Sequence, residues 1–185
     1  MQKKHFFTLI EILVATGIIA ILAGIGFAGY SYANNAGREK ATQMIIQQLT
    51  TALETCHTKL GFYPASAAYG EIKFSFTNDI PDNMTFNNAA ISSNANMKKK
   101  FNDLMFKTLD MESLRAYCGS DGVLRDAWGN PIYYSYPGSV NTTKYDIISA
   151  GPDGMFGKDD AAAPVTDKAQ YLDGKDWVCD DIANF

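Results

Sequence analysis

The sequence predicts an α+β protein in which a long N-terminal helix packs on a small antiparallel β-sheet formed by the C-terminal part of the chain. Three observations lead to this prediction. Residues 12–30 contain no charged side chain, and apolar residues then recur every three or four positions as far as residue 60. Residues 132–149 contain two runs of aromatic and β-branched residues with turn-forming residues between them. The 185 residues suffice for one domain with a modest core.

Residues 12–30 are long enough to span a bilayer, because a helix of that length measures roughly 28 Å. Lys3 and Lys4 precede the segment and no basic residue follows before Arg38. The positive-inside rule therefore predicts a single-pass protein with a cytoplasmic N-terminus and an extracytoplasmic C-terminal part. A cleaved secretory signal is the alternative. The length of the apolar run and the presence of Glu11 at its start argue against it.

Residues 7–14, FTLIEILV, closely resemble the leader junction and N-terminal helix of type IV pilins and type II secretion pseudopilins. This resemblance implies the type IV pilin-like fold. It also implies that a prepilin peptidase cuts between Phe6 and Phe7 and that the new N-terminal Phe7 is methylated. The family has Gly before the cut, where this chain has Phe6. We therefore expect a leader (1–6), a transmembrane or filament-core helix (7–30), its amphipathic continuation (31–61) and a head (62–185).

Glu11 is the one carboxylate in this apolar region, and it corresponds to the Glu at the fifth position of mature pilins. A carboxylate buried among packed apolar helices is costly unless it is paired. Pairing with the free α-amino group of a neighbouring subunit's Phe7 would compensate the charge and set the register between subunits. The alternative is that Glu11 lies at the level of the lipid headgroups.

Gly61 and Pro64 are expected to end the long helix. Residues 65–116 show few sequence patterns that indicate structure, and we expect them to form a variable loop. Within this region we expect a polar stretch at 87–96 and a short helix from 98 to 109 that begins with three lysines. We interpret the lysines as a solvated helix end.

The C-terminal part, residues 126–185, is expected to contain a β-hairpin with strands at 132–136 and 144–149. Tyr145 and Ile147 share one face of the second strand, so both should pack toward the long helix. The arrangement resembles the head of major pseudopilins.

Residues 149–160 and 180–185 are rich in Asp and Gly, which suits a hard cation such as calcium. An EF-hand is excluded because Met155 stands where that loop needs Asp or Asn. The segments resemble the calcium loop of the major pseudopilin of type II secretion. The resemblance implies five ligands: the Ala150 and Met155 carbonyls and the carboxylates of Asp153, Asp180 and Asp181. Asp159 and Asp160 form an alternative acidic pair, and an acidic solvated loop without metal is the competing interpretation.

The three cysteines are extracytoplasmic in this topology, where disulfides persist, and they allow at most one intramolecular pair. Cys118 and Cys179 flank the predicted sheet, whereas Cys56 lies on the core face of the helix. We therefore expect a disulfide between Cys118 and Cys179.

Composition and motifs together indicate a structural protein rather than an enzyme. The net charge of −4 argues against nucleic acid as the main partner. Two His, three Cys and no CxxC or HExxH argue against a zinc or iron–sulfur enzyme. A calcium-dependent secreted hydrolase is also unsupported, because no GxSxG motif occurs.

The resemblance implies an inner-membrane subunit of a type II secretion pseudopilus, a short filament that drives protein export. The implied partners are further copies of the chain, other pseudopilins, the inner-membrane assembly platform and the prepilin peptidase. The alternative is a type IV pilin or minor pilin that serves adhesion, motility or DNA uptake. The calcium loop favours secretion.

Overall fold

The chain begins with α1 (Leu9–Leu60), a 52-residue helix, as the apolar pattern predicts. Gly61 ends it with a φ of 80°, a conformation that glycine adopts without strain, and its N–H donates to the His57 carbonyl at 2.8 Å. The structure is a computed structural model, and it describes residues 8–77, 80–86, 89–90, 94–173, 176–177 and 179–185. The chain divides into two compact units, residues 1–37 and 38–185.

The N-terminal unit contains a helical segment that is apolar enough to cross a membrane. Its most apolar 18 residues have a mean hydropathy of 2.4, and none of that window is buried within the chain. Large apolar side chains such as Leu13, Ile19 and Leu22 are more than half exposed. Such a continuous apolar surface is stable only against lipid or against other apolar helices.

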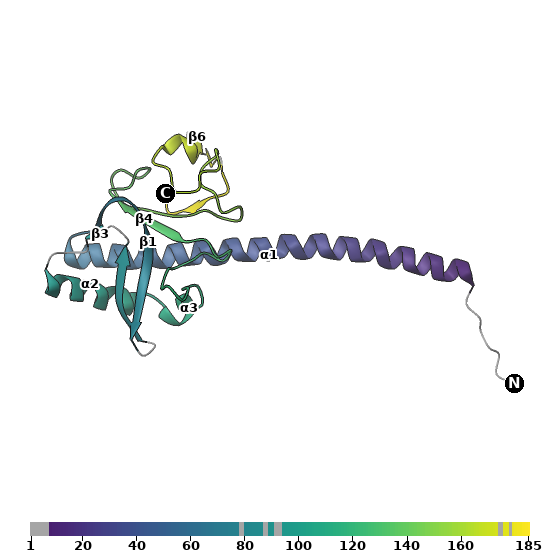
Figure 1. The fold of residues 1–185 in the computed structure, drawn as a ribbon, viewed down its shortest axis with the longest axis horizontal. Coiled ribbons are helices and arrows are strands. Elements are labelled where there is room, and N and C mark those ends of the chain that lie inside the picture. Colours follow the sequence, from purple (N-terminus) through teal and green to yellow (C-terminus); the bar gives the residue numbers. More distant parts are fainter. Residues whose placement is uncertain (1–7, 78–79, 87–88, 91–93, 174–175, 178) are drawn as a thin grey trace. The chain divides into compact units, whose positions relative to one another are not determined.

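The head, residues 38–185, contains an antiparallel sheet in the order β2-β1-β4-β5-β8, with β3 paired to β1 (Figure 1). The strands are β1 (Ala65–Thr77), β2 (Ile80–Phe86), β3 (Ala89–Ala90), β4 (Ile132–Tyr136), β5 (Asp146–Ser149) and β8 (Ile182–Ala183). A separate two-stranded hairpin pairs β6 (Leu172–Asp173) with β7 (Asp176–Trp177). The helices are α2 (Ala95–Thr108), α3 (Met111–Arg115) and the 3₁₀ helix η1 (Lys168–Gln170).

One face of the sheet packs on the C-terminal half of α1 and forms the main core. Leu49, Leu53 and Cys56 of α1 are fully buried there against strand residues. The prediction that Tyr145 and Ile147 face the long helix is confirmed, since both are buried in this cluster and the Tyr145 hydroxyl donates to the Thr50 carbonyl at 3.3 Å. The opposite face supports a second, smaller cluster of buried residues: Val140, Ile148, Ala150, Phe156 and Tyr171.

The expectation of a variable loop over residues 65–116 is wrong for its first part, where β1 and β2 form the longest strand pair of the sheet. Ile72 and Phe74 of β1 are buried, and Phe76 packs against the same core. These apolar residues are spaced two apart, which is typical of a strand with one buried face. The sequence alone does not show that this face is buried. The short helix expected at 98–109 is confirmed as α2, which Asn94 caps by accepting from the Asn96 N–H at 2.9 Å.

Candidate functional site

The predicted cleavage site between Phe6 and Phe7 lies outside the described residues, but Glu11 lies within them. Its Oε2 accepts hydrogen bonds from the backbone N–H and the hydroxyl of Thr8, both at 2.8 Å. The Glu11 N–H donates back to the Thr8 hydroxyl oxygen at 3.4 Å. Together the two residues form a capping box at the start of α1. Sequence reasoning missed the role of Thr8, although the Thr-x-x-Glu spacing is its signal.

This cap gives the Glu11 carboxylate partners within its own subunit. A carboxylate in an apolar environment is costly when it is unpaired, and two hydrogen bonds reduce that cost. The carboxylate is nevertheless exposed at the surface of the helix, so its charge stays accessible to a group on another molecule.

The second candidate site is the acidic loop that follows β5, and the sheet explains why its distant halves meet. β8 pairs antiparallel with β5, so that Ser149 lies opposite Ile182. Asn184 strengthens this pairing, because its Oδ1 accepts from the Ile147 N–H at 2.7 Å. As a result Asp180 and Asp181, which directly precede β8, lie beside the turn that directly follows β5.

The turn itself is shaped by Gly151 and Gly154, which have φ values of 66° and 75°. A Cβ added at Gly151 would collide with the backbone carbonyl of Asp180, so only glycine allows the two segments to come this close. The side-chain amide of Asn130 donates to the Gly151 carbonyl at 2.8 Å and ties the turn to the loop before β4. Sequence reasoning did not assign this role to Asn130, and we find no sequence pattern that would have revealed it.

Three predicted carboxylates lie near one another at this turn. Asp153 is exposed, and its Oδ1 accepts from the Met155 N–H at 2.9 Å. Burial and the nearby charge of Asp153 raise the pKa of Asp180. Burial also raises the pKa of Asp181 to about 6, and the charges of Asp180 and Asp153 contribute to this shift. Burial is the largest cause of both pKa shifts and repulsion between the carboxylates adds to it, and a nearby cation would oppose both effects.

Asp181 is a buried carboxylate with one oxygen whose hydrogen-bonding capacity is not satisfied. Only 5% of the residue is exposed, and its Oδ2 accepts from the Gly157 N–H at 2.7 Å. Its Oδ1 is buried and accepts no hydrogen bond of ordinary geometry from the described residues, although the Cys179 thiol lies close enough to the carboxylate to lower its pKa. A buried carboxylate oxygen without a donor is costly and is suited to a cation.

The donor set fits a hard cation even though no metal-holding group of side chains is preformed. Within the described ranges, no three His, Cys, Asp or Glu side chains are arranged to hold a metal ion. Calcium, however, takes carboxylate and backbone carbonyl oxygens together in flexible geometry. The predicted set of three carboxylates with the Ala150 and Met155 carbonyls matches that preference.

The alternative pair, Asp159 and Asp160, is placed differently. Asp159 Oδ2 accepts a hydrogen bond of 2.6 Å from the side-chain amide of Gln170, next to η1. Asp160 adopts a φ of 53° and is close enough to Asp180 to raise its pKa. Asp159 and Asp160 therefore lie in a different local environment from Asp181, and the choice between the two acidic pairs stays a prediction.

The disulfide expected between Cys118 and Cys179 is not formed, since all three cysteines are free in the structure. Cys118 packs against the main core on one face of the sheet, whereas Cys179 packs against the smaller cluster on the other. Proximity to the sheet in sequence therefore does not bring the two sulfur atoms together. Cys56 is fully buried in the main core, as predicted.

Comparison with known proteins finds one family model that matches part of the head. Residues 97–168, which are less than half of the chain, match the family model described as Type II secretion system (T2SS), protein G. No curated protein and no solved structure matches the chain. The matched region covers most of α2, α3, the β4–β5 hairpin and the first part of the acidic loop. Over these residues the chain is therefore similar to protein G of type II secretion systems, and the long apolar helix packed on a small antiparallel sheet is an α+β, pilin-like arrangement consistent with that family.

Proposed function

We propose that the protein is the filament subunit of a type II secretion pseudopilus. The observation that carries this proposal is the combination of a protein G-type head with a long, wholly exposed apolar helix. In the membrane the apolar helix is covered by lipid. In a filament the same surface would be covered by the helices of other copies, so that extraction from the bilayer need not expose it to water.

The proposed orientation places the N-terminus in the cytoplasm and the head on the far side of the inner membrane. Prepilin peptidase would cut before Phe7 and leave a free, methylated α-amino group. That group is a suitable partner for the Glu11 carboxylate of a neighbouring copy, in the dry environment between packed helices. Other pseudopilins and the inner-membrane assembly platform are the further proposed partners.

We also propose that the head binds one calcium ion through Asp153, Asp180, Asp181 and the carbonyls of Ala150 and Met155. The ion would supply positive charge to oxygens that otherwise repel one another, and so hold the C-terminal segment on β5. The support for this proposal is the unpartnered buried oxygen of Asp181 and the close approach that Gly151 permits.

The assembly proposal is tested by separating the two roles of Glu11. Gln at this position retains the capping box, because Glu and Gln both serve in it, but it removes the charge. We expect Glu11→Gln to insert into the membrane normally and to form no filaments, when the full chain is expressed with its secretion partners and sheared filaments are measured. Glu39→Gln is the matched control, since Glu39 lies on the same helix beyond the apolar segment and accepts from Gln43 at 3.1 Å. Normal filaments from Glu11→Gln would show that the charge pair is not required.

A further inference from the structure

Charge is distributed unevenly over the head. Helix α2 contains four lysines against one aspartate. Residues 150–185 contain eight aspartates against three lysines. Neither the metal site nor the membrane helix accounts for the lysines of α2, and only three of the eight aspartates belong to the proposed calcium ligands.

The basic face is the outer surface of α2. Its inner surface is buried in the main core through Phe101 and Met105. The amphipathic spacing places Lys99, Lys100 and Lys107 on the outside, where all three are exposed. Beside this face, α1 and the end of α2 border an open groove of about 240 Å³ lined by Met44, Gln47, Gln48, Thr51 and Thr108. Met44 is 61% exposed there.

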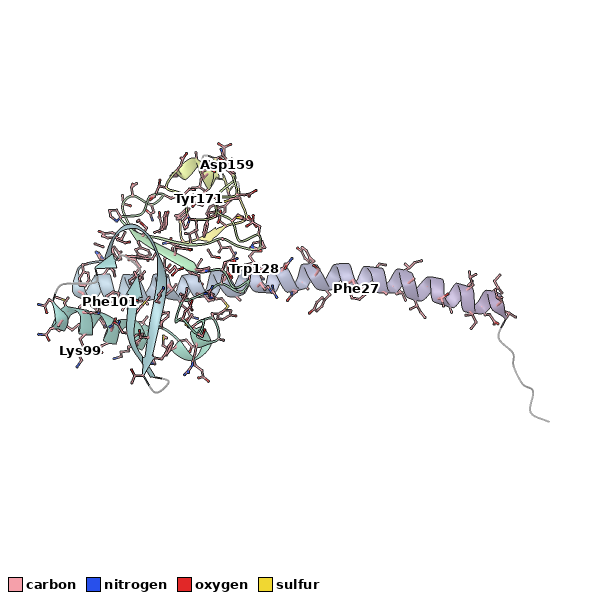
Figure 2. The ribbon with its side chains drawn as sticks, viewed as in Figure 1. Phe27, Lys99, Phe101, Trp128, Asp159 and Tyr171 are labelled. Atoms are coloured by element: carbon pink, nitrogen blue, oxygen red, sulfur yellow. The ribbon has the colours of Figure 1, made fainter. Side chains whose placement is uncertain are left out.

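The acidic face is formed by the segment that follows β5. Its exposed aspartates outside the proposed metal ligands are Asp159, Asp160, Asp167 and Asp173. The same segment carries the exposed apolar side chains of Met155 and Trp177. Together with Met44, these two are the only exposed large apolar side chains in the described part of the head. Figure 2 shows Lys99 and Asp159 on opposite sides of the head.

We propose that the basic face of one head docks on the acidic face of a second copy of this chain, and that this contact joins neighbouring heads in the filament. The two faces are complementary in charge, and the contact would also cover Met44 beside the basic face and Met155 and Trp177 on the acidic one. Because they lie on opposite sides, the contact is heterologous and leaves one free face of each kind for the next copy. Such contacts generate open helical assemblies. The inference rests on the proposed function, since it concerns the same filament.

The test compares two charge reversals of equal size in the full chain, with sheared filaments measured against salt concentration. Lys99→Glu with Lys100→Glu places like charges in contact, and we expect the filament fraction at low salt to fall by about tenfold. Lys158→Glu with Lys168→Glu is the matched control, because it makes the acidic face more acidic. That variant should assemble as well as the unmodified chain or better. Raising the salt should diminish the difference between the two variants.

A charge exchange provides the decisive measurement. Adding Asp159→Lys and Asp173→Lys to the Lys99→Glu, Lys100→Glu chain restores opposite charges across the contact, and it should recover the filaments. Melting curves check the folding of each variant, since Asp159 also accepts from Gln170. In unmodified filaments, carbodiimide should join α2 lysines to aspartates of residues 150–185 in another copy, as peptide mapping would show.

Each other outcome has a definite meaning. If the unmodified chain forms no filaments, the proposed function fails. If filaments form and both double reversals behave alike, the docking proposal is overturned while the function stands. If Lys99→Glu with Lys100→Glu assembles normally but loses binding to phosphatidylglycerol vesicles, the basic face is a membrane-surface site and the docking proposal is also overturned.

Discussion

Replacing Asp181 by Asn tests the calcium proposal, because the variant should be more stable than the unmodified head without calcium and less stable with it. Without a cation, Asp181 is a buried carboxylate with one unpartnered oxygen, and burial raises its pKa from 3.8 to about 6. The folded head then binds more protons than the unfolded chain between these two values. Stability contributed by the neutral carboxyl is therefore present below about pH 4, and is lost as the pH rises through 6.

The size of the effect follows from the pKa shift. A shift of about two units corresponds to ~3 kcal/mol of lost stability at pH 7. Asn has the shape of Asp without its charge, and its Oδ1 can still accept from the Gly157 N–H. Asp181→Asn should therefore raise the melting temperature of the chelated head at pH 7, by roughly 6–12 °C for a domain of this size.

Calcium should make the unmodified head more stable than Asp181→Asn. At a free concentration one thousand times the dissociation constant, the ion adds about 4.1 kcal/mol to a head that binds it, which exceeds the ~3 kcal/mol advantage of the variant. The unmodified head, residues 38–185, should gain this amount and Asp181→Asn should gain little. The assay is thermal melting at pH 4 and pH 7, in chelator and in calcium, and magnesium should substitute poorly. If Asp181→Asn melts lower than the unmodified head in chelator at pH 7, the reasoning about the buried charge is wrong. If calcium leaves the unmodified head unchanged, the metal site is refuted.

Three further predictions concern the turn, the thiols and processing. Gly151→Ala should destabilise the head by more than ~1 kcal/mol in urea unfolding, because its φ is positive and the added Cβ meets the Asp180 carbonyl. Gly129→Ala is the control and should destabilise less, because its φ is also positive but the added Cβ meets nothing. Alkylation without reductant after unfolding should label all three cysteines, and a single labelled cysteine would reveal a disulfide. In the folded head Cys56 should stay unlabelled, because it is fully buried and burial raises its pKa to about 11. Mass spectrometry of the protein extracted from membranes should find a chain starting at Phe7, and an intact leader would contradict the proposed cleavage.

The sequence alone was sufficient for the features that local periodicity encodes. The apolar run, the three- and four-residue spacing and Gly61 predicted α1 to its last residue. The aromatic runs predicted the β4–β5 hairpin and the face that meets the helix. In these segments each residue's environment follows from its own position in a helix or a strand, so that neighbours in sequence carry the information.

Tertiary structure decided the features that depend on contacts between distant segments. The pairing of β8 with β5 places Asp180 beside Gly151, and Asp159 accepts a hydrogen bond from Gln170; spacing along the chain reveals neither contact. The free Cys118 and Cys179 lie on opposite faces of that sheet, which spacing along the chain cannot show. Such arrangements are set by which surfaces bury one another, and that is a property of the whole packed chain rather than of any local pattern.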